Sequence, residues 1–194
     1  MATLILARHG ETDWNRDGRW QGHADRPLNE LGREQAGALA ATLADEPVAA
    51  VYSSDLRRAR DTAAIVARTH GLGVEVDPRL REIDVGEWEG LTMREIERRY
   101  PGYVESWPPD DGKPFPRGET YAAMGERVVR ALTEIAERHA EETVVVILHG
   151  GPIRSALAHA AGITYAEQRE RRGHLANCDV LRIAVQEGAF TPVD

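Results

Sequence analysis

The chain of 194 residues contains a single cysteine, Cys178. One thiol cannot form a disulfide within the chain, and such scarcity is typical of proteins from a reducing compartment. No apolar run reaches the length that a membrane-spanning helix needs. The N-terminus also lacks the pattern of a secretory signal or transit peptide, because its apolar run at residues 4–7 is short and leads into polar residues. We therefore expect a cytoplasmic protein.

An excess of positive charge is also missing, since the formal net charge is −8. Nucleic acids and anionic membranes favour a basic protein face, so neither is an expected partner. The same charge sets a condition on any phosphate site in this chain. An acidic protein that binds phosphate must gather its arginines locally, against the field of the whole molecule.

The usual metal and nucleotide motifs do not occur. Seven histidines are present, but none stands in an HxH, HxxxH or HExxH arrangement. There is no glycine-rich P-loop and no dinucleotide fingerprint. Cys178 is followed by Arg182 rather than by a phosphate-cradling loop, which argues against a cysteine-based phosphatase. The sequence predicts neither a metal nor a cofactor.

Short apolar runs alternate with amphipathic segments of helix length along most of the chain. Strands are expected at residues 4–7, 48–52, 74–76, 143–148 and 180–185, and helices at about 29–45, 54–67, 92–99, 120–139 and 150–161. The polar residues 14–26 are expected to form a loop that is too irregular for a helix. The alternation predicts a mostly parallel sheet in a three-layer α/β/α sandwich, and the length fits one domain spanning 1–194.

Residues 78–118 interrupt this pattern with closely spaced prolines and with Trp88 and Trp107. The segment holds too few apolar residues for a core of its own, so we expect a lid excursion over the crevice rather than a second domain. Trp88, Trp107 and Tyr103 could stack on a substrate ring. We favour packing within the lid, which is the commoner use of such aromatic side chains.

Two of the expected strands end in the same pair of residues. Arg8-His9-Gly10 closes the first strand and His149-Gly150 closes the most apolar one, while the helix after the second strand carries Arg58 in its first turn. Ligands of open α/β sheets gather beyond the carboxyl ends of the strands. A lone histidine there would more often cap the strand or bind a carbonyl oxygen. Two histidines beside arginines indicate a site.

Imidazoles and guanidiniums together suit a phosphoryl group, because guanidinium forks match phosphate oxygens and neutralise their charge. Nearby arginines should keep the ring of His9 neutral and therefore nucleophilic. Attack by a neutral imidazole on phosphorus gives a phosphohistidine. Glu82 follows the third strand and is the candidate proton donor, because a carboxyl group facing a bound phosphate is favoured in its protonated form. Only this placement distinguishes Glu82 from an ordinary surface carboxylate.

Four blocks of the chain, taken in order, resemble one known family. They are Arg8-His9-Gly10-Glu11-Thr12, Ser53-Ser54-Asp55-Leu56-Arg57-Arg58-Ala59, Leu80-Arg81-Glu82 with Gly86-Glu87-Trp88-Glu89-Gly90, and His149-Gly150. Together they look like the histidine phosphatase superfamily, and most closely its cofactor-dependent phosphoglycerate mutase branch. The likeness covers nearly the whole chain. A lone Arg-His-Gly would not be specific.

The resemblance implies a role for each matching residue. His9 would be the residue that is phosphorylated, and Glu82 would give and take the proton. Arg8, Arg58 and His149 would bind the phosphoryl group and stabilise its transition state. The implied activity is metal-independent hydrolysis of small phosphate esters.

The resemblance also places further contacts. Asn15, Gln21 and Gly22 resemble the family's loop that touches phosphate or substrate, and Gly150 would supply a backbone contact. The family's second block usually continues to Gln-Thr, whereas this chain has Asp61 before the threonine. Asp61 on the helix surface would change little. Facing the pocket, it would repel a second anionic group.

Two alternatives remain at this stage. A phosphohistidine can pass its phosphoryl group to water or back to a phosphorylated sugar acid, as in a mutase. The lid is short, the chain ends soon after the last expected strand, and residues 116–120 resemble a Gly-Glu-Ser/Thr signature of phosphatase members, so we favour hydrolysis. A non-catalytic phospholigand-binding protein would lack the nucleophile or the acid, and this chain has both. The family often dimerises, which leaves a homodimer open.

Overall fold

The computed structural model describes residues 1–104, 112–172 and 175–193. Within them, six strands form one sheet in the order β3-β2-β4-β1-β5-β6. Strands β1 (Ala2–Arg8), β2 (Val48–Ser53), β3 (Val74–Val76) and β4 (Thr143–Leu148) are parallel, and β5 (Val180–Gln186) and β6 (Ala189–Val193) join by antiparallel pairing. The predicted mostly parallel sheet is confirmed.

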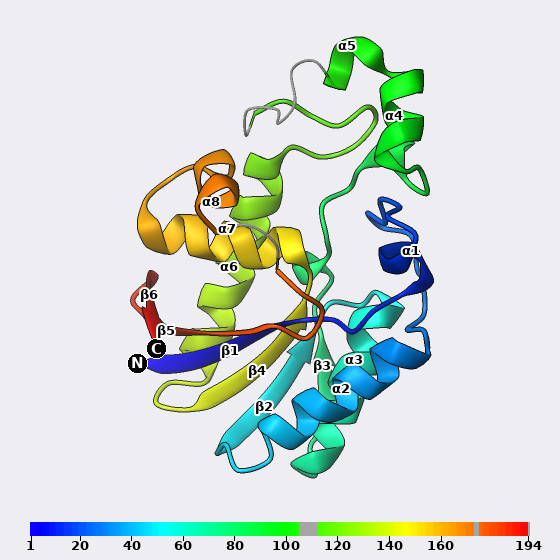
Figure 1. Cartoon of the computed structure of the whole chain (residues 1–194). Coiled ribbons are helices and arrows are strands. Elements are labelled where there is room, and N and C mark those ends of the chain that lie inside the picture. Colours follow the sequence, from blue (N-terminus) through cyan, green and yellow to red (C-terminus); the bar gives the residue numbers. More distant parts are fainter. Residues whose placement is uncertain (105–111, 173–174, 194) are drawn as a thin grey trace.

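Helices cover both faces of this sheet (Figure 1). Helices α2 (Glu30–Thr42) and α3 (Arg57–Thr69) lie on one face, and α6 (Tyr121–Arg138) and α7 (Gly150–Ala161) lie on the other. Successive residues of a strand point to opposite faces. Accordingly, Leu4 and Leu6 join the apolar cluster under α6 and α7, whereas Ile5 and Ala7 join the cluster under α2 and α3. The three-layer sandwich is as predicted.

Two predicted helix starts agree closely with the caps. The helix predicted from residue 54 is an exception, because α3 begins only at Arg57 and its N-cap, Leu56, makes no side-chain hydrogen bond. The side chain of Thr92 caps α4 (Met93–Arg99), and that of Thr120 caps α6, whose C-cap is His139. Each threonine oxygen accepts a hydrogen bond from a backbone amide of the first turn, which would otherwise have no partner in the helix. The predicted starts of these two helices thus coincide with threonine N-caps.

The prediction of a helix-free loop at residues 14–26 is wrong at its start. Asp13–Arg16 forms a one-turn helix, α1. Thr12 and Asn15 form a reciprocal capping box that satisfies the first amides of the turn. These polar hydrogen bonds stabilise the turn, and none of its residues is buried. A search for apolar periodicity therefore could not predict it.

The sheet also continues past the strand predicted to be last. A two-residue turn at Glu187 and Gly188 leads from β5 into β6, and both residues have positive φ values of 50° and 79°. Positive φ at both central positions matches the twist of a tight hairpin. Phe190 in β6 is buried in the main apolar cluster. The residues after the hairpin are thus an edge strand and not a tail.

Within residues 78–118, the part that the structure describes (78–104 and 112–118) contains four short elements: η1 (Pro78–Leu80), η2 (Gly86–Trp88), α4 and α5 (Pro101–Val104). Its apolar side chains Leu80, Trp88, Ile96 and Phe115 are fully buried in the same cluster as α6 and α7. Trp88 packs edge-on against Trp20, Tyr103 and Phe115, which confirms packing for Trp88. Trp107 lies outside the described residues.

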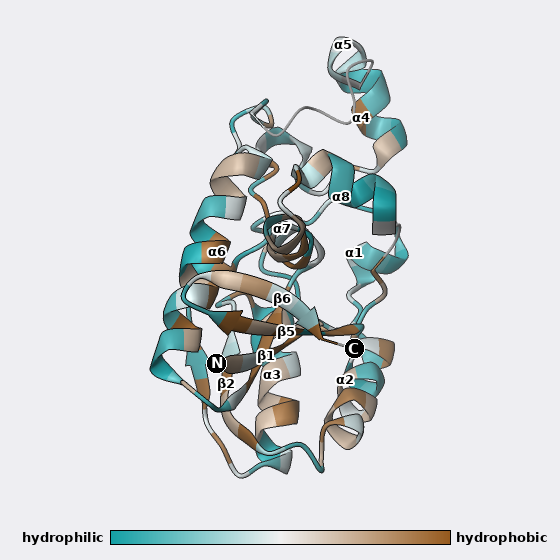
Figure 2. Cartoon of the chain, turned by 90° about the vertical axis from the view of Figure 1, so that its left-hand side faces the viewer, coloured by the Kyte–Doolittle hydropathy of each residue, from teal (hydrophilic) through white to brown (hydrophobic). Residues whose placement is uncertain are grey.

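Figure 2 shows hydrophobic residues concentrated on the sheet and on the helix faces turned toward it. Helix α8 (Tyr165–Arg172), which the sequence did not predict, is largely hydrophilic. Its Tyr165 is nevertheless buried, and α8 packs beside α7. Among the residues that the structure describes, no helix is long and apolar enough to cross a membrane.

Candidate active site

The two central strands bring the two histidines together. In the parallel pairing of β1 with β4, Arg8 lies opposite Leu148, and the amide of His9 donates to the carbonyl oxygen of Leu148 at 3.0 Å. The next residue in each strand is therefore a histidine at the same edge. The ring centroids of His9 and His149 are 5.1 Å apart, with an interplanar angle of 63°. The predicted convergence of the two His-Gly pairs is confirmed.

His9 is held in one protonation state. Its Nδ1 lies 2.7 Å from the carbonyl oxygen of Gly10, which can only accept, so Nδ1 carries the proton and Nε2 is left with its lone pair. Burial lowers the pKa of His9 well below its usual 6.5, and the charges of Arg58 and Arg8 lower it further. The ring is thus neutral at neutral pH, as expected, but burial is a larger cause than the arginines.

His149 is fully buried beside it. Burial also lowers the pKa of His149 well below 6.5, with Arg58 as the next cause. Neither ring nitrogen of His149 has a hydrogen-bond partner among the described residues. A buried polar atom without a partner costs free energy. Two such atoms beside His9 indicate that a bound group completes the site.

Gly10 lies where the loop after β1 packs closely against α2. Its amide donates to the hydroxyl of Thr62 on α3 at 3.1 Å. A Cβ at Gly10 would overlap the carbonyl oxygen of Gly32 in the first turn of α2, and a Cβ at Gly32 would overlap the carbonyl oxygen of Glu11. The glycine after His9 therefore permits the close approach of α2, which fixes the backbone of the histidine.

Two arginines flank the histidines. Arg58, in the first turn of α3, is 1% exposed, and it donates to the carbonyl oxygens of Ala24 at 2.7 Å and Gly22 at 2.9 Å. Burial lowers the pKa of Arg58 to about 10, so it stays charged at neutral pH. Arg8 donates from Nη1 to the carbonyl oxygen of Leu175. Both cations are bound to neutral carbonyls, so neither is neutralised by these contacts.

Glu82 reaches the same place from the segment after β3. Its carboxylate accepts from the amide of Gly151 at 3.2 Å, in the first turn of α7, and from the amide of Ile83 at 3.0 Å. The segment that carries it is fixed by Arg127 of α6. The guanidinium of Arg127 donates to the carbonyl oxygens of Arg79, Arg81 and Glu82 at 2.7–2.9 Å.

The same Arg127 guanidinium also forms an ion pair with the carboxylate of Glu119. Arg127 forms a two-pronged ion pair with Glu119, with distances of 2.7 and 2.8 Å, and each side chain is 17% exposed. Glu119 also accepts from the amide of Asp84 at 3.2 Å. Glu119 belongs to the Gly-Glu-Thr stretch singled out in the sequence. In this structure it anchors the segment that bears Glu82.

The loop residues of the prediction are held by polar contacts around Thr12. The hydroxyl of Thr12 donates to Gln21 Oε1 at 2.9 Å, and Asn15 Oδ1 accepts from the amide of Thr12 at 3.2 Å. Gly22 has a φ of +49°, and its carbonyl oxygen accepts from Arg58. Asn15 and Gln21 are thus tied to Thr12, the N-cap of α1, and Gly22 is tied to the arginine of α3.

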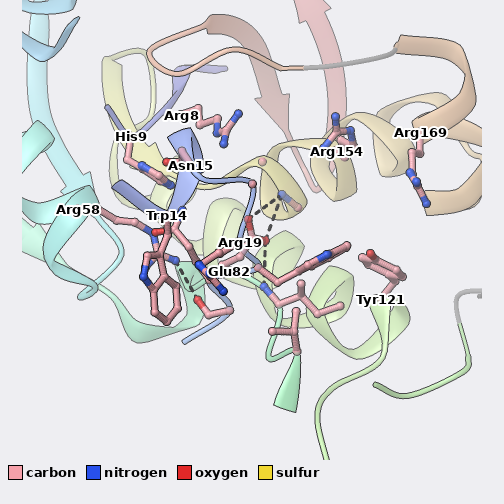
Figure 3. A pocket seen from close by; sticks show the side chains of 18 of the residues that line it. Arg8, His9, Trp14, Asn15, Arg19, Arg58, Glu82, Tyr121, Arg154 and Arg169 are labelled. Carbon is pink, nitrogen blue, oxygen red and sulfur yellow. Dashed lines mark hydrogen bonds between the residues drawn. The ribbon is translucent and has the colours of Figure 1, made fainter. Parts of the chain in front are cut away.

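One cavity joins most of the predicted residues (Figure 3). Eight of them line it: Arg8, His9, Asn15, Gln21, Gly22, Arg58, Glu82 and Gly150. His149 is not part of this wall and reaches the site through its contact with the ring of His9. Trp88 and Tyr103 do not line it either. Asp61 lies on another surface, where it pairs with Arg57 at 3.6 Å.

The sequence missed several residues of the wall. They are Trp14, Gly18, Arg19, Trp20, Ile83, Val85, Tyr121, Gly151, Arg154, Tyr165 and Arg169. Arg154 falls one turn after the His149-Gly150 motif on the same helix, so helical spacing from that motif could have found it. Arg169 gave no such signal, because it lies on a helix whose apolar residues are only Tyr165 and Ala166.

Comparison with known proteins agrees with this geometry. Residues 4–194 match the family model of the histidine phosphatase superfamily (branch 1). The chain belongs to this superfamily. Members transfer phosphoryl groups through a phosphohistidine, and this chain is accordingly an enzyme, a phosphomonoester hydrolase.

Three relatives illustrate the likeness. Phosphoserine phosphatase 1 of Hydrogenobacter thermophilus is 38% identical over 84% of this chain and 78% of its own. The metal-independent phosphoserine phosphatase of Arabidopsis thaliana is 41% identical over 78% of this chain and 66% of its own. A mycobacterial glucosyl-3-phosphoglycerate phosphatase, solved in complex with VO3, has a TM-score of 0.88 and 33% identity, covering 98% of this chain and 96% of that one.

The described part of this histidine phosphatase shows no candidate metal site. Within residues 1–104, 112–172 and 175–193, no three His, Cys, Asp or Glu side chains come together in a way that could hold a metal ion.

Proposed function

We propose that the protein hydrolyses small phosphate esters in two steps, with His9 as the nucleophile. The observation that carries this assignment is the hydrogen bond from Nδ1 of His9 to the carbonyl of Gly10, which leaves Nε2 unprotonated in the cavity. In the first step, Nε2 forms a bond to phosphorus while the bond from phosphorus to the ester oxygen breaks. The product is a phosphohistidine.

Glu82 acts as the general acid in the first step and as the general base in the second. Its protonated carboxyl group gives a proton to the departing ester oxygen, and the alcohol leaves. The carboxylate then removes a proton from water, whose oxygen attacks phosphorus as the bond to Nε2 breaks. Inorganic phosphate is released, and neutral His9 and protonated Glu82 are regenerated. The amide of Gly151, at the start of α7, holds this carboxyl group at the cavity wall.

The cations of the site stabilise the transferred group. Arg8 and Arg58 supply positive charge and N–H donors for the phosphoryl oxygens. His149 donates from a ring nitrogen that has no partner among the described residues. Helix α7 begins at Gly150, and helix N-termini favour anions through their unpaired amides and dipole.

The remaining wall orients the substrate. Asn15, Gln21 and Gly22 line the cavity next to Trp14 and contact the ester or its phosphate. From the predicted lid segment, Glu82, Ile83 and Val85 line the cavity. The reported relatives are phosphatases by name, which supports water as the phosphoryl acceptor. The single cysteine supports a reducing compartment such as the cytoplasm.

Trapping the intermediate tests the proposal. The protein is mixed with p-nitrophenyl phosphate in the presence of a chelator, quenched in alkali and analysed by mass spectrometry. We expect p-nitrophenol release and one phosphoryl group on the peptide that contains His9. His9→Ala should abolish both, whereas His159→Ala, an exposed residue of α7, should abolish neither. A label on another residue, or turnover in His9→Ala, would overturn the assignment.

A further inference from the structure

The backbone pairing of β1 with its neighbours extends as far as His9. The amide of His9 donates to the carbonyl oxygen of Leu148 at 3.0 Å, and the carbonyl oxygen of Arg8 accepts from the amide of Cys178 at 3.0 Å. The peptide group between Arg8 and His9 is thus held by backbone on both sides. Strand β1 ends at Arg8, so the two peptide groups that follow His9 need partners of another kind.

Two side chains hold the peptide group between His9 and Gly10. The carbonyl oxygen of His9 accepts from Nδ2 of Asn177 at 2.9 Å, and the amide of Gly10 donates to the hydroxyl of Thr62 at 3.1 Å. A carbonyl oxygen can only accept, so the amide nitrogen of Asn177 faces it. Asn177 lies just before β5 and Thr62 lies on α3. Two distant parts of the chain therefore fix this peptide plane.

The hydroxyl of Thr62 acts as an acceptor toward Gly10 because its own proton is already used. It donates that proton to the carbonyl oxygen of Arg58, one turn earlier on α3, at 2.8 Å. Thr62 is 0% exposed, so water does not compete for the hydroxyl. The same group thus joins the backbone of Gly10 to that of Arg58, and Figure 3 shows His9 and Arg58 on the same side of the cavity.

A third side chain holds the next peptide group, between Gly10 and Glu11. The amide of Glu11 donates to Oε1 of Gln35 on α2 at 2.8 Å. The carbonyl oxygen of the same peptide group lies 2.7 Å from Nδ1 of His9. The amide and the carbonyl belong to one rigid plane, so Gln35 directs the carbonyl toward the ring. Gly10 alone would not, because a glycine adopts many backbone conformations.

The contact between Nδ1 and this carbonyl decides which ring nitrogen can react. With the proton on Nδ1, the lone pair that attacks phosphorus is on Nε2. With the proton on Nε2, that atom cannot attack. The ring also gains positive charge as Nε2 bonds to phosphorus, so the hydrogen bond from Nδ1 becomes charge-assisted and strengthens. An interaction that strengthens in this way raises kcat rather than substrate affinity.

We propose that Gln35, Thr62 and Asn177 are positioning residues that together keep the proton of His9 on Nδ1. They bind the two peptide groups after His9 and act on the substrate only through the ring. None of the three is among the described residues that line the cavity. The inference rests on the proposed function, because it assumes that Nε2 of His9 attacks phosphorus.

NMR of the resting enzyme observes the proton directly. In isotope-labelled protein at neutral pH, long-range proton–nitrogen spectra distinguish a protonated Nδ1 from a protonated Nε2, and His9→Ala identifies the signals of His9. We expect a proton on Nδ1 alone in the unmodified protein. Gln35→Met, Thr62→Val and Asn177→Ala should each shift His9 toward a mixture of both forms. Spectra of the three variants that match the unmodified protein would overturn the inference.

Single-turnover kinetics measure the consequence for the reaction. p-Nitrophenolate leaves without a proton, so its rate of release reports attack by His9 and not proton transfer from Glu82. Each variant should slow this release by about tenfold, the loss expected when a hydrogen bond to a charged group is weakened. The affinity for inorganic phosphate should stay nearly unchanged, because Arg8, Arg58 and His149 are retained. Release at the unmodified rate, or equal losses of rate and phosphate affinity, would contradict the positioning role.

Two further variants separate positioning from packing. Thr62→Ser keeps the hydroxyl and should keep the proton on Nδ1 and nearly the full rate. Thr42→Val is the matched control, because the exposed hydroxyl of Thr42 also donates to a carbonyl one turn earlier, that of Ala38 at 3.0 Å. It should change neither measurement. Equal rate losses in Thr62→Ser and Thr62→Val would mean that Thr62 acts through packing alone. Asn177 is only half-buried, so Asn177→Ala tests the inference without a change in the core.

The two measurements also separate this inference from the proposed function. Phosphoryl labelling of His9, with the ring proton and the rate unchanged in the variants, would refute only the positioning role. A shift of the ring proton in the variants without phosphoryl labelling of His9 would refute the proposed mechanism and leave the control of the ring proton standing.

Discussion

The amide nitrogen of Gly151 lies 3.2 Å from Oε1 and 3.3 Å from Oε2 of Glu82, so the carboxylate rests on the first turn of α7. The approach requires a glycine, because a Cβ at position 151 would overlap Oε1 of Glu82. The second glycine of the His149-Gly150-Gly151 stretch thus places the proposed acid, although it takes no part in the chemistry itself.

Gly151→Ala should therefore impair proton transfer. We expect the carboxylate to be displaced and kcat/KM for alkyl phosphates to fall by about 100-fold, because general acid catalysis contributes about that much or more. Gly125→Ala is the matched control, since its nearest neighbour, the side chain of Ser155, would lie 3.6 Å from the new methyl group. Equal effects of the two changes on alkyl ester hydrolysis would contradict the placement.

Glu82→Gln should distinguish the two halves of the reaction. An amide cannot give a proton to an alkoxide, so kcat/KM for alkyl phosphates should fall by about 100-fold or more. The p-nitrophenolate group leaves without a proton, and its release should persist. Hydrolysis of the phosphohistidine also needs a base, so stopped-flow traces should show a burst of p-nitrophenolate followed by slow turnover. Traces without a burst and with unchanged steady rates would contradict this role.

Arg127→Lys should loosen the segment that carries Glu82. A lysine ammonium cannot reproduce the guanidinium fork that contacts Glu119 and three backbone carbonyls. We expect about a tenfold larger loss of kcat/KM with alkyl than with p-nitrophenyl phosphate. Arg130→Lys, an exposed neighbour on the same helix, should show no such selectivity. A uniform loss on all esters would mean that Arg127 supports the fold alone.

The buried histidines should make the fold sensitive to acid. The pKa values of His9 and His149 are well below 6.5 in the folded chain, so the unfolded chain binds more protons below pH 6.5. Stability is then fully present above the unfolded pKa and falls as the pH decreases, by up to about 1.4 kcal/mol per pH unit for each histidine.

Urea unfolding at several pH values measures this slope. His149→Asn should reduce the decline between about pH 6 and pH 5 by about 1.4 kcal/mol per unit, because one titrating group is removed. The exposed His159→Asn should leave the slope nearly unchanged. The prediction is wrong if both variants follow the unmodified protein.

Gly10→Ala should destabilise the protein even though it adds only a methyl group. The new Cβ would overlap the carbonyl oxygen of Gly32, which is backbone and cannot rotate away. We expect a loss of about 3 kcal/mol or more. Gly37→Ala in α2 meets nothing within 4 Å and should stabilise the helix by about 1 kcal/mol. Thermal unfolding compares the two, and equal melting temperatures would contradict the contact.

The sequence predicted the parts of the site that follow strands. Buried strands have strong apolar signals, and parallel pairing carries His9 and His149 to one edge. Arg169 could not be found in this way, because its helix has only Tyr165 and Ala166 as apolar residues and its position depends on packing against α7. The roles of Glu119 and Arg127 could not be predicted either. Their ion pair joins residues eight positions apart, and the sequence does not indicate that Arg127 also binds the backbone carbonyls of Arg79, Arg81 and Glu82.

The pairing of Arg8 with Leu148 in the middle of the sheet has a consequence for how such an enzyme can diversify. A shift of one position in either strand would turn every buried side chain of that strand to the opposite face of the sheet. Because such a shift is strongly unfavourable, substitutions are not expected to change the position of His9. Helix α8 and the segment around α4 have no such restraint. New substrates can therefore be acquired by remodelling the periphery, while the reactive centre is inherited unchanged.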